Sequence, residues 1–437
     1  MSPFENKYVI GLTGNIAVGK SVVRQMLQHL GAYTIDADGL THQAMSPGAP
    51  AYQPIVEMFG KFILDSEGRV NRATLGAIAF AVPDALPKLE QIIHPFVGQA
   101  VVALANRAKQ RVIVVEAIKL LESDLASMVD TVWVVDATAE TQVRRLMDKR
   151  KLSLEDARRR MMAQPPQAEK MARAKVVIKN DGSVEDTWKQ VQAVWNAVVS
   201  PAVGGNTMPQ AVPTMPAQPT PQPQPAQRPV QQIAPTQRPT QPSPPPADAT
   251  LPVRPTAQPV APVVPQTSSL LSPKTEVGIR RGMPNNADLI AKFISRVSRS
   301  PVDRMDIMLA FGQKSFLLAL GDNDVLISVI GWQVENLITR VDEFYLDPTV
   351  PRDPVISALV VAIEEASREL QSEVSFIFLP KTVSPDVIQA FVTNGYQPLN
   401  LTAIKFPAWR EAAHEMVSPD TQGLIKQLRA DRIMKPI

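Results

Sequence analysis

A proline-rich stretch divides this chain into two blocks that must fold around it. Twenty of the 41 prolines lie between Pro201 and Pro265, among glutamine, alanine, threonine and valine. The stretch has no aromatic residue and no apolar period, so it cannot bury enough surface to offset the entropy of ordering it. We expect residues 201–273 to form a disordered, semi-extended linker between one domain at 1–200 and another at 274–437.

Composition excludes several classes of site. Cysteine is absent, so disulfides, thiolate nucleophiles and cysteine-ligated metals are excluded. A net charge of +3 does not by itself indicate a nucleic-acid partner, and no apolar run reaches the roughly 18 residues of a membrane span. We therefore expect a cytoplasmic protein that binds neither nucleic acid nor membrane. A histidine-rich metal site is not expected, because the histidines are scattered at His29, His42, His94 and His414.

The first block alternates short apolar runs with amphipathic stretches. Runs of β-branched residues such as 111–115 and 132–135 are typical of strands buried on both faces of a parallel sheet. The alternation predicts an α/β domain with a doubly wound parallel sheet. The predicted strands are 8–13, 33–35, 111–115, 132–135 and 176–178. The predicted helices are 21–30, 52–59, 73–80, 86–93, 95–109, 140–150, 154–163 and 184–199.

A glycine-rich loop follows the first predicted strand. It matches G-x-x-x-x-G-K-[ST], in which backbone N–H groups wrap a phosphate and the next helix directs its positive end there. Lys20 would reach the β- and γ-phosphates of ATP, and the Ser21 hydroxyl would be a ligand of Mg²⁺. The expected nucleotide-binding residues are Gly14, Asn15, Ile16, Ala17, Val18, Gly19, Lys20 and Ser21.

Two aspartates end the second predicted strand. The carboxyl ends of parallel strands share one edge, where ligands bind, so Asp36 and Asp38 should face the same crevice as the glycine-rich loop. A carboxylate there can orient an acceptor hydroxyl and take its proton, or hold Mg²⁺ through water. One of the two aspartates also fits the N-cap of the next helix, which would be a structural role. Of the two, we expect Asp38 more than Asp36 to have the functional role.

Basic residues cluster late in the first block. A kinase needs cations, often on a mobile lid, to neutralise the transferring phosphoryl group. Most charge-rich helices are only solvated faces, so we expect a few of these residues to be functional and the rest to be surface. The cluster comprises Arg144, Arg145, Lys149, Arg150, Lys151, Arg158, Arg159 and Arg160.

Several motifs, in order, make residues 8–197 resemble the dephospho-CoA kinase family. Besides the glycine-rich loop they are IDAD at 35–38, NRATL at 71–75, HP at 94–95, LLE at 120–122, VVD at 134–136, R-x-x-x-Q at 160–164 and A-x-x-x-I-x-N at 174–180. The resemblance implies a P-loop kinase core with a lid and a helical substrate region at 40–110. It also implies transfer of a phosphoryl group from ATP to the 3′-hydroxyl of dephospho-CoA, the last step of CoA biosynthesis.

The resemblance also assigns roles to individual residues. Asp38 would be the base that faces the ribose 3′-hydroxyl, and Asn180 would lie near the adenine. Lys20 would act on the phosphates together with Lys149 or Arg150, and which of those two contacts them stays open. The expected substrate-binding residues are Asp36, Arg72, His94, Glu122 and Arg160.

The chain departs from the family pattern at three places. Asn15, Ala17 and Val18 replace the usual Gly, Gly and Ser; asparagine tolerates a left-handed backbone, whereas valine is stiffer. Residues 118–119, Ile-Lys, replace the usual Pro-Leu, and Lys149 replaces a lid arginine.

The second block predicts a separate α+β fold with an antiparallel meander. Its predicted strands are 277–280, 315–320, 325–330, 336–346 and 374–379, and its predicted helices are 286–298, 355–370 and 386–391. It more weakly resembles a GNAT-type acetyltransferase. The glycines with which that family binds pyrophosphate are missing from 352–358, and its usual tyrosine acid falls on Phe391. We therefore expect no acetyl transfer, although this domain could bind a CoA-like molecule or a partner.

Two alternative functions stay open. One is a P-loop kinase for a nucleoside or nucleotide, and the other is a bifunctional protein whose second domain binds acyl-CoA or transfers acetyl groups. We further expect the two blocks to act independently, with no residue of the second block near the glycine-rich loop.

Overall fold

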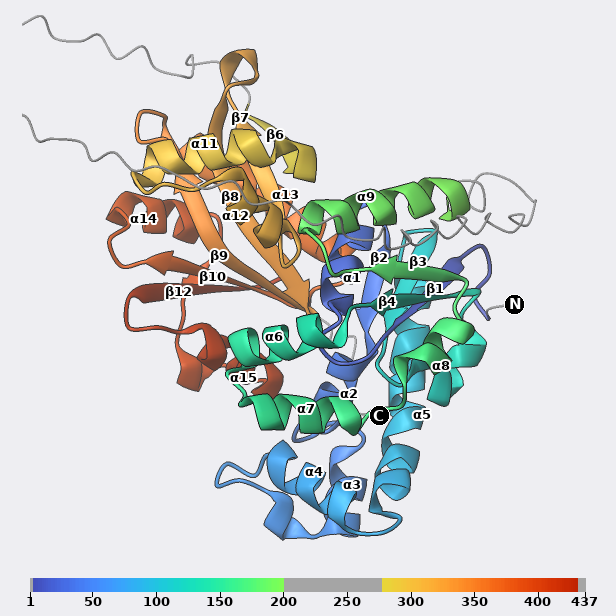
Figure 1. The fold of residues 1–437 in the computed structure, drawn as a ribbon. Helices are drawn as coiled ribbons and strands as arrows, with labels where there is room; N and C mark the ends of the chain where they lie inside the picture. The colour runs from blue at the N-terminus through green and yellow to red at the C-terminus, as the bar shows by residue number, and fades with distance from the viewer. Residues whose placement is uncertain (1–2, 200–276, 431–437) are drawn as a thin grey trace, which may run out of the picture. The chain divides into compact units, whose positions relative to one another are not determined.

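The computed structural model describes residues 3–199 and 277–430. The expected linker at 201–273 lies outside these residues. The described chain contains two sheets with their helices, and both belong to one compact unit (Figure 1). None of its helices combines the length and the apolar character that crossing a membrane requires.

The first sheet has five parallel strands in the order β2-β3-β1-β4-β5, as the alternating pattern predicts. The strands are β1 (Tyr8–Thr13), β2 (Tyr33–Asp36), β3 (Val112–Glu116), β4 (Thr131–Asp136) and β5 (Val176–Lys179). The helices are α1 (Lys20–His29), α2 (Ala37–Ala44), α3 (Tyr52–Phe59), α4 (Arg72–Ala81), α5 (Ala85–Arg107), α6 (Ala139–Arg150), α7 (Leu154–Met162), α8 (Gln167–Ala172) and α9 (Val184–Val194).

Both faces of this sheet are buried. On β1, Val9 packs in a core that α5 covers, whereas Ile10 and Leu12 pack in a second core with Leu27 of α1 and Trp188 of α9. Alternate side chains of a strand point to opposite faces, so a strand between two layers of helices has to be apolar throughout. This explains why the β-branched runs were readable as strands.

Helix α5 corrects one prediction. The sequence suggested two helices separated at Pro95, but the structure has a single helix with Pro95 inside it. A proline in a helix removes one N–H donor and crowds the preceding turn. Burial of Ile93 before it and of Val97 and Leu104 after it holds both halves against the same core.

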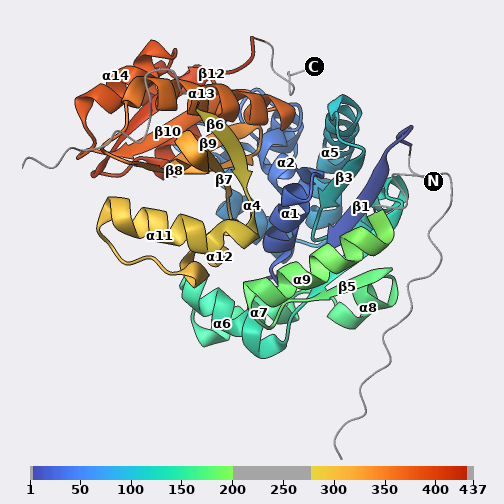
Figure 2. The ribbon, with the colours of Figure 1, turned by 90° about the horizontal axis from the view of Figure 1, so that it is seen from above.

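The second sheet has seven strands in the order β11-β12-β10-β9-β8-β7-β6. Its pairs are antiparallel except for β9 with β10, which are parallel. Helices α13 and α14 cover one face, and α11 and α12 cover the other (Figure 2). The strands are β6 (Gly278–Gly282), β7 (Ser315–Leu320), β8 (Leu326–Glu335), β9 (Ile338–Leu346), β10 (Val374–Pro380), β11 (Gln397–Pro398) and β12 (Thr421–Gln427). The helices are α11 (Ala287–Ser298), α12 (Arg304–Phe311), α13 (Arg352–Glu369), α14 (Pro385–Thr393) and α15 (Pro407–Met416).

The α+β class of the second block is confirmed, but the sequence did not identify α12, α15 and β12. Strand β12 (TQGLIKQ) mixes polar residues with a glycine, and it forms because β10 offers a complete antiparallel partner. Such non-local pairing cannot be read from a short window of sequence.

Candidate active site

The glycine-rich loop between β1 and α1 has a left-handed backbone at three positions. The φ angles are 148° at Gly14, 60° at Ala17 and 95° at Gly19. The position of Ala17 is costly for a residue with a Cβ, by about 1–2 kcal/mol. Asn15, whose residue type tolerates that backbone, does not use it. Its side-chain Nδ2 instead donates to the Pro165 carbonyl at 2.9 Å.

Two glutamines reach over this loop: Gln164 lies between α7 and α8, and Gln167 is the first residue of α8. The Ile16 N–H donates to Oε1 of Gln164 at 2.7 Å, and the Asn15 N–H donates to Oε1 of Gln167 at 2.9 Å. Nε2 of Gln167 donates in turn to the Val135 carbonyl. These amide oxygens take the backbone donors that the motif assigns to a phosphate, so a bound nucleotide has to replace them. Gln164 belongs to the expected lid motif, whereas Gln167 was not predicted.

Arg145 of α6 fastens the loop from the other side. Its Nη1 donates to the carbonyls of Ala17 (3.2 Å) and Val18 (3.0 Å), and its Nη2 donates to the Asn180 carbonyl. The Asn180 side chain is buried, and it donates to the Val18 carbonyl at 2.8 Å while accepting from Thr187. From the sequence, Arg145 was predicted only as one member of the basic cluster. Its carbonyl contacts show that it holds the loop itself.

Lys20 and Ser21 begin α1 above a buried carboxylate. The Ser21 hydroxyl donates to Oε1 of Glu116 at 3.3 Å, and Nε of Arg24 donates to Oε2 at 2.6 Å. Lys20 is buried, which lowers its pKa, while Glu116 and the two aspartates oppose that shift. Glu116 was missed because the predicted strand stopped one residue earlier. It ends β3, so the rule that located Asp36 applies to it as well.

The two aspartates at the end of β2 have different tasks. Asp36 is the N-cap of α2, where its Oδ1 accepts the Gly39 N–H at 2.9 Å. Asp38 lies in the first turn of that helix and accepts the Ile118 N–H at 3.1 Å. Ile118 stands where the family pattern has proline, which lacks an N–H. The departure therefore gives Asp38 a hydrogen-bond donor.

Burial raises the pKa of Asp38 to about 6, and the negative charge of Asp36 adds to the rise. The Lys20 ammonium and the Ile118 N–H act in the opposite direction. A carboxylate with a pKa near the working pH can both accept and release a proton, as a general base has to do.

A cavity of about 500 Å³ opens beside Asp38. It lies between α2, α5 and the segment after β3, and it brings Asp38 together with His94, Thr41 and Lys119. The rest of its lining is largely apolar, with Pro95, Val97, Val102, Leu125 and Met128. The cavity thus offers polar groups at one end and an apolar wall for a long organic substituent.

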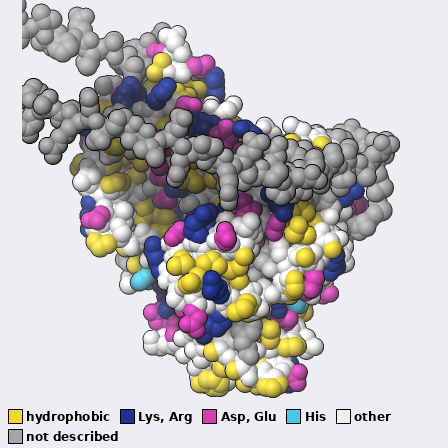
Figure 3. Space-filling model, in the orientation of Figure 1, with side chains coloured by type: hydrophobic (Ala, Val, Ile, Leu, Met, Phe, Trp, Pro, Cys, Tyr) yellow, Lys and Arg dark blue, Asp and Glu magenta, His cyan; other side chains and the backbone are white. Residues whose placement is uncertain are grey.

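The other expected substrate residues lie outside this cavity. Glu122 makes a 3.7 Å ion pair with Lys170, a buried lysine that the sequence reading did not single out. Arg72 is exposed at the start of α4 and lines a different cavity together with His42. Three expected lid cations are exposed on α6 and α7: Lys149, Arg150 and Arg160. Large exposed apolar side chains accompany them, namely Met147, Leu154 and Met162. Figure 3 shows hydrophobic and charged side chains mixed on one face of the molecule.

In the second domain, the residues at the positions of the acetyltransferase motifs make other contacts or are buried. Arg352 at the start of α13 makes a 2.5 Å ion pair with Asp386. Phe391 is fully buried and offers no hydroxyl. The neighbouring Tyr396 has its hydroxyl within 2.9 Å of Ser375 Oγ, and burial raises its pKa. The absence of acetyl transfer stays a prediction.

Two glycines provide a matched test of the loop geometry. A Cβ on Gly19 would collide with Nδ2 of Asn180 and would sit at a φ of 95°, whereas a Cβ on Gly76 in α4 meets nothing within 4 Å. Gly19→Ala should lower the free energy of unfolding by roughly 2–4 kcal/mol. Gly76→Ala should raise it by roughly 0.5–1 kcal/mol, because alanine favours a helix. Urea unfolding measures both, and equal midpoints would contradict the loop contacts described above.

Comparisons with known proteins agree with this geometry. Residues 8–186 match the model of a family described as dephospho-CoA kinase. The dephospho-CoA kinase of Geobacter sulfurreducens is 43% identical over 190 residues, which cover 43% of this chain and 96% of that protein. That of Geobacillus kaustophilus is 43% identical over 195 residues, which cover 43% of this chain and 97% of that protein.

Solved structures resemble each block. The dephospho-CoA kinase from Campylobacter jejuni is 27% identical, with a TM-score of 0.31 over 44% of this chain and 97% of that one. An acetyltransferase of the GNAT family from Streptococcus pneumoniae is 12% identical, with a TM-score of 0.27 over 35% of this chain and 99% of that one. The sequence relatives are matched over nearly their whole length by the block that carries the P-loop, and through that block the chain belongs to the dephospho-CoA kinase family.

Proposed function

We propose that this protein transfers the γ-phosphoryl group of ATP to the 3′-hydroxyl of dephospho-CoA, giving CoA and ADP. One observation supports this most directly: Asp38 lines the substrate-sized cavity and also lies within the electrostatic reach of Lys20 in the P-loop. An acceptor hydroxyl held against Asp38 would therefore face the end of the nucleotide.

On the nucleotide side, the backbone donors of the P-loop would hold the phosphates after Gln164 and Gln167 have moved away. Lys20 begins α1 and would attract the β- and γ-phosphates. Arg145 keeps the loop in shape through its carbonyl contacts. Asn180, which we expected near the adenine, supports the loop through Val18, and a contact with the base remains a proposal.

Mg²⁺ fits the donors at the start of α1. The Ser21 hydroxyl lies 3.3 Å from Glu116 Oε1, so a hydroxyl and a carboxylate, the oxygen ligands that Mg²⁺ prefers, stand together. Across residues 3–199 and 277–430, no three acidic or histidine side chains are grouped to hold a metal by themselves. Phosphate oxygens would therefore complete the site, and the ion would neutralise phosphate charge there.

On the acceptor side, Asp38 would accept the proton of the 3′-hydroxyl as its oxygen attacks the γ-phosphorus. The bond from the γ-phosphorus to the β,γ-bridging oxygen breaks, and ADP leaves. His94 and Lys119 line the same cavity and would orient the substrate. Roles for Asp36, Arg72, Glu122 and Arg160 on the substrate, and for Lys149 or Arg150 on the phosphates, are proposals from the resemblance.

Substitutions at the two central charges test this assignment. Lys20→Ala and Asp38→Asn should each lower kcat with dephospho-CoA by ~10²–10⁴-fold, because each removes a charge used in the transition state. Glu57→Gln, at an exposed position on α3, should leave the rate unchanged. ADP release measures all three. Near-parent turnover by Asp38→Asn would contradict its role, and preference for adenosine, AMP or uridine as acceptor would favour the nucleoside kinase alternative.

The raised pKa of Asp38 predicts the pH dependence. If Asp38 is the base, kcat/KM should fall as the pH drops through about 6, because the protonated carboxyl cannot accept a proton. Asp36→Asn keeps a capping oxygen but removes a negative neighbour, so it should lower the pKa of Asp38 and move this limb to lower pH. ATP titrates in the same way in assays of the parent, of Asp36→Asn and of the control Glu57→Gln. Its titration therefore cannot cause a difference between their pH profiles. A limb that stays in place or moves upward in Asp36→Asn would contradict the assignment.

A further inference from the structure

The P-loop helix α1 packs against the second sheet. Nε2 of Gln25, a buried residue, donates to Ser315 Oγ at 3.1 Å. His29 places its Nε2 within 3.1 Å of the Phe311 carbonyl, and the two rings lie 5.4 Å apart. The two blocks therefore contact each other through α1, whereas their independence in activity stays a prediction. Gln25 and His29 each have a hydrogen-bond partner across this contact.

The turn between β8 and β9 has an unusual residue at its tip. The two strands are joined by Asn336 and Leu337, whose φ angles are 52° and 64°. Two-residue turns with both φ angles positive favour Asn-Gly, because glycine has no Cβ to strain. Leucine at the second position is a backbone outlier, and such outliers persist where other contacts compensate for them.

The Leu337 side chain explains the outlier. It is 7% exposed and packs in the apolar core of the kinase block, which also contains Tyr33 and Ile35 of β2 and Leu104 of α5. Nearby, Nε2 of Gln371 donates to the Leu104 carbonyl at 2.9 Å in a buried contact. A leucine at this tip that packed against nothing would have a strained backbone and an exposed apolar side chain.

Asn336 contacts the helix that carries the proposed base. Its carbonyl accepts from Nε2 of Gln43 on α2 at 2.7 Å. Its side-chain Oδ1 is so close to Gly39 that a Cβ there would collide with it. Gly39 is also the residue whose N–H is capped by Asp36, one position after Asp38. The turn thus contacts α2 at Gly39, in its first turn, and at Gln43.

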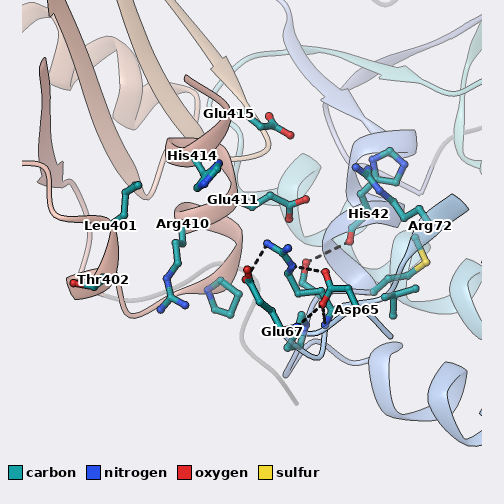
Figure 4. Close-up of a pocket in the computed structure, with 16 residues that line it drawn as sticks. His42, Asp65, Glu67, Arg72, Leu401, Thr402, Arg410, Glu411, His414 and Glu415 are labelled. Atoms are coloured by element: carbon teal, nitrogen blue, oxygen red, sulfur yellow. Dashed lines mark hydrogen bonds and ion pairs between the residues drawn. The ribbon is translucent and has the colours of Figure 1, made fainter. Parts of the chain in front are cut away.

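Beside this contact, α15 of the second domain faces α2 across a cavity of about 950 Å³. Arg410, Glu411 and His414 line one wall, and His42 and Arg72 line the other (Figure 4). Charges of both signs face the opening, so the cavity does not by itself select a ligand. It does show that the second domain reaches the substrate side of the kinase.

We propose that Asn336 and Leu337 are positioning residues for phosphotransfer: their turn docks on β2 and α2 and fixes the helix that presents Asp38. The second domain is then a structural component of the kinase site. The catalytic part of this inference rests on the proposed function, whereas the docking part does not.

Docking can be measured without substrate. A protease site placed within 211–268 of the full chain allows cleavage after folding, and the two fragments should elute together. Leu337→Gly suits the left-handed backbone, so the hairpin should still form while the docked side chain is lost. It should weaken association of the fragments by about 10- to 100-fold, the equivalent of exposing one leucine. Leu337→Met should restore association, and Val361→Ala, at an exposed site on α13, should not alter it.

Positioning has two readouts in the uncut chain. Leu337→Gly should speed amide hydrogen exchange at 37–44 but not at 139–150, and it should lower kcat roughly tenfold with the KM for ATP little changed. Leu337→Met should recover both. Fragments that separate in the parent, or Leu337→Gly with parent-like exchange at 37–44, would overturn the proposal. A parent chain inactive with dephospho-CoA would overturn the proposed function and the catalytic part of this inference, but not the docking part, because association and exchange need no substrate.

Discussion

The arrangement of the site depends on one constraint, that parallel strands end at a common edge. The edge collects the P-loop from β1, Asp36 from β2 and Glu116 from β3, without help from sequence neighbours. Carboxylates gathered in this way would repel each other in a buried place. Lys20 and Arg24, both on the first turns of α1, supply the compensating charge, and the 2.6 Å contact of Arg24 with Glu116 is the closest of these. The proposed nucleotide site is therefore charged, and side chains of the protein supply both signs of charge.

The parts of the fold that were predictable from sequence are those that short windows of residues encode. β-branched runs located the parallel strands, and the pattern around Gly14 to Ser21 located the P-loop. The break expected at Pro95 was wrong, because tertiary burial on both sides outweighed the local cost. Strand β12 was missed because its partner β10 lies far away in the chain.

The candidate site shows the same division. The sequence predicted that one of two aspartates caps a helix but not which one. The hydrogen bond from the Gly39 N–H shows that Asp36 is the cap. Arg145 and Gln167 were not singled out, since a residue type does not reveal which backbone carbonyl or N–H it contacts. A charge-rich helix such as α6 looks alike whether its cations face solvent or a loop.

Leu337 has a consequence for synthesis of the chain. Its left-handed backbone costs about 1–2 kcal/mol, and its burial returns roughly 1.5–3 kcal/mol, so the docked state is favoured by only a small margin at this residue. The kinase block is made first, and about 140 further residues separate its last helix from Leu337. At elongation rates of roughly 5–20 residues per second, about 7 to 28 seconds pass between synthesis of the last helix of the kinase block and synthesis of Leu337. During that interval the apolar core around Leu104 lacks the leucine that completes it in the full chain.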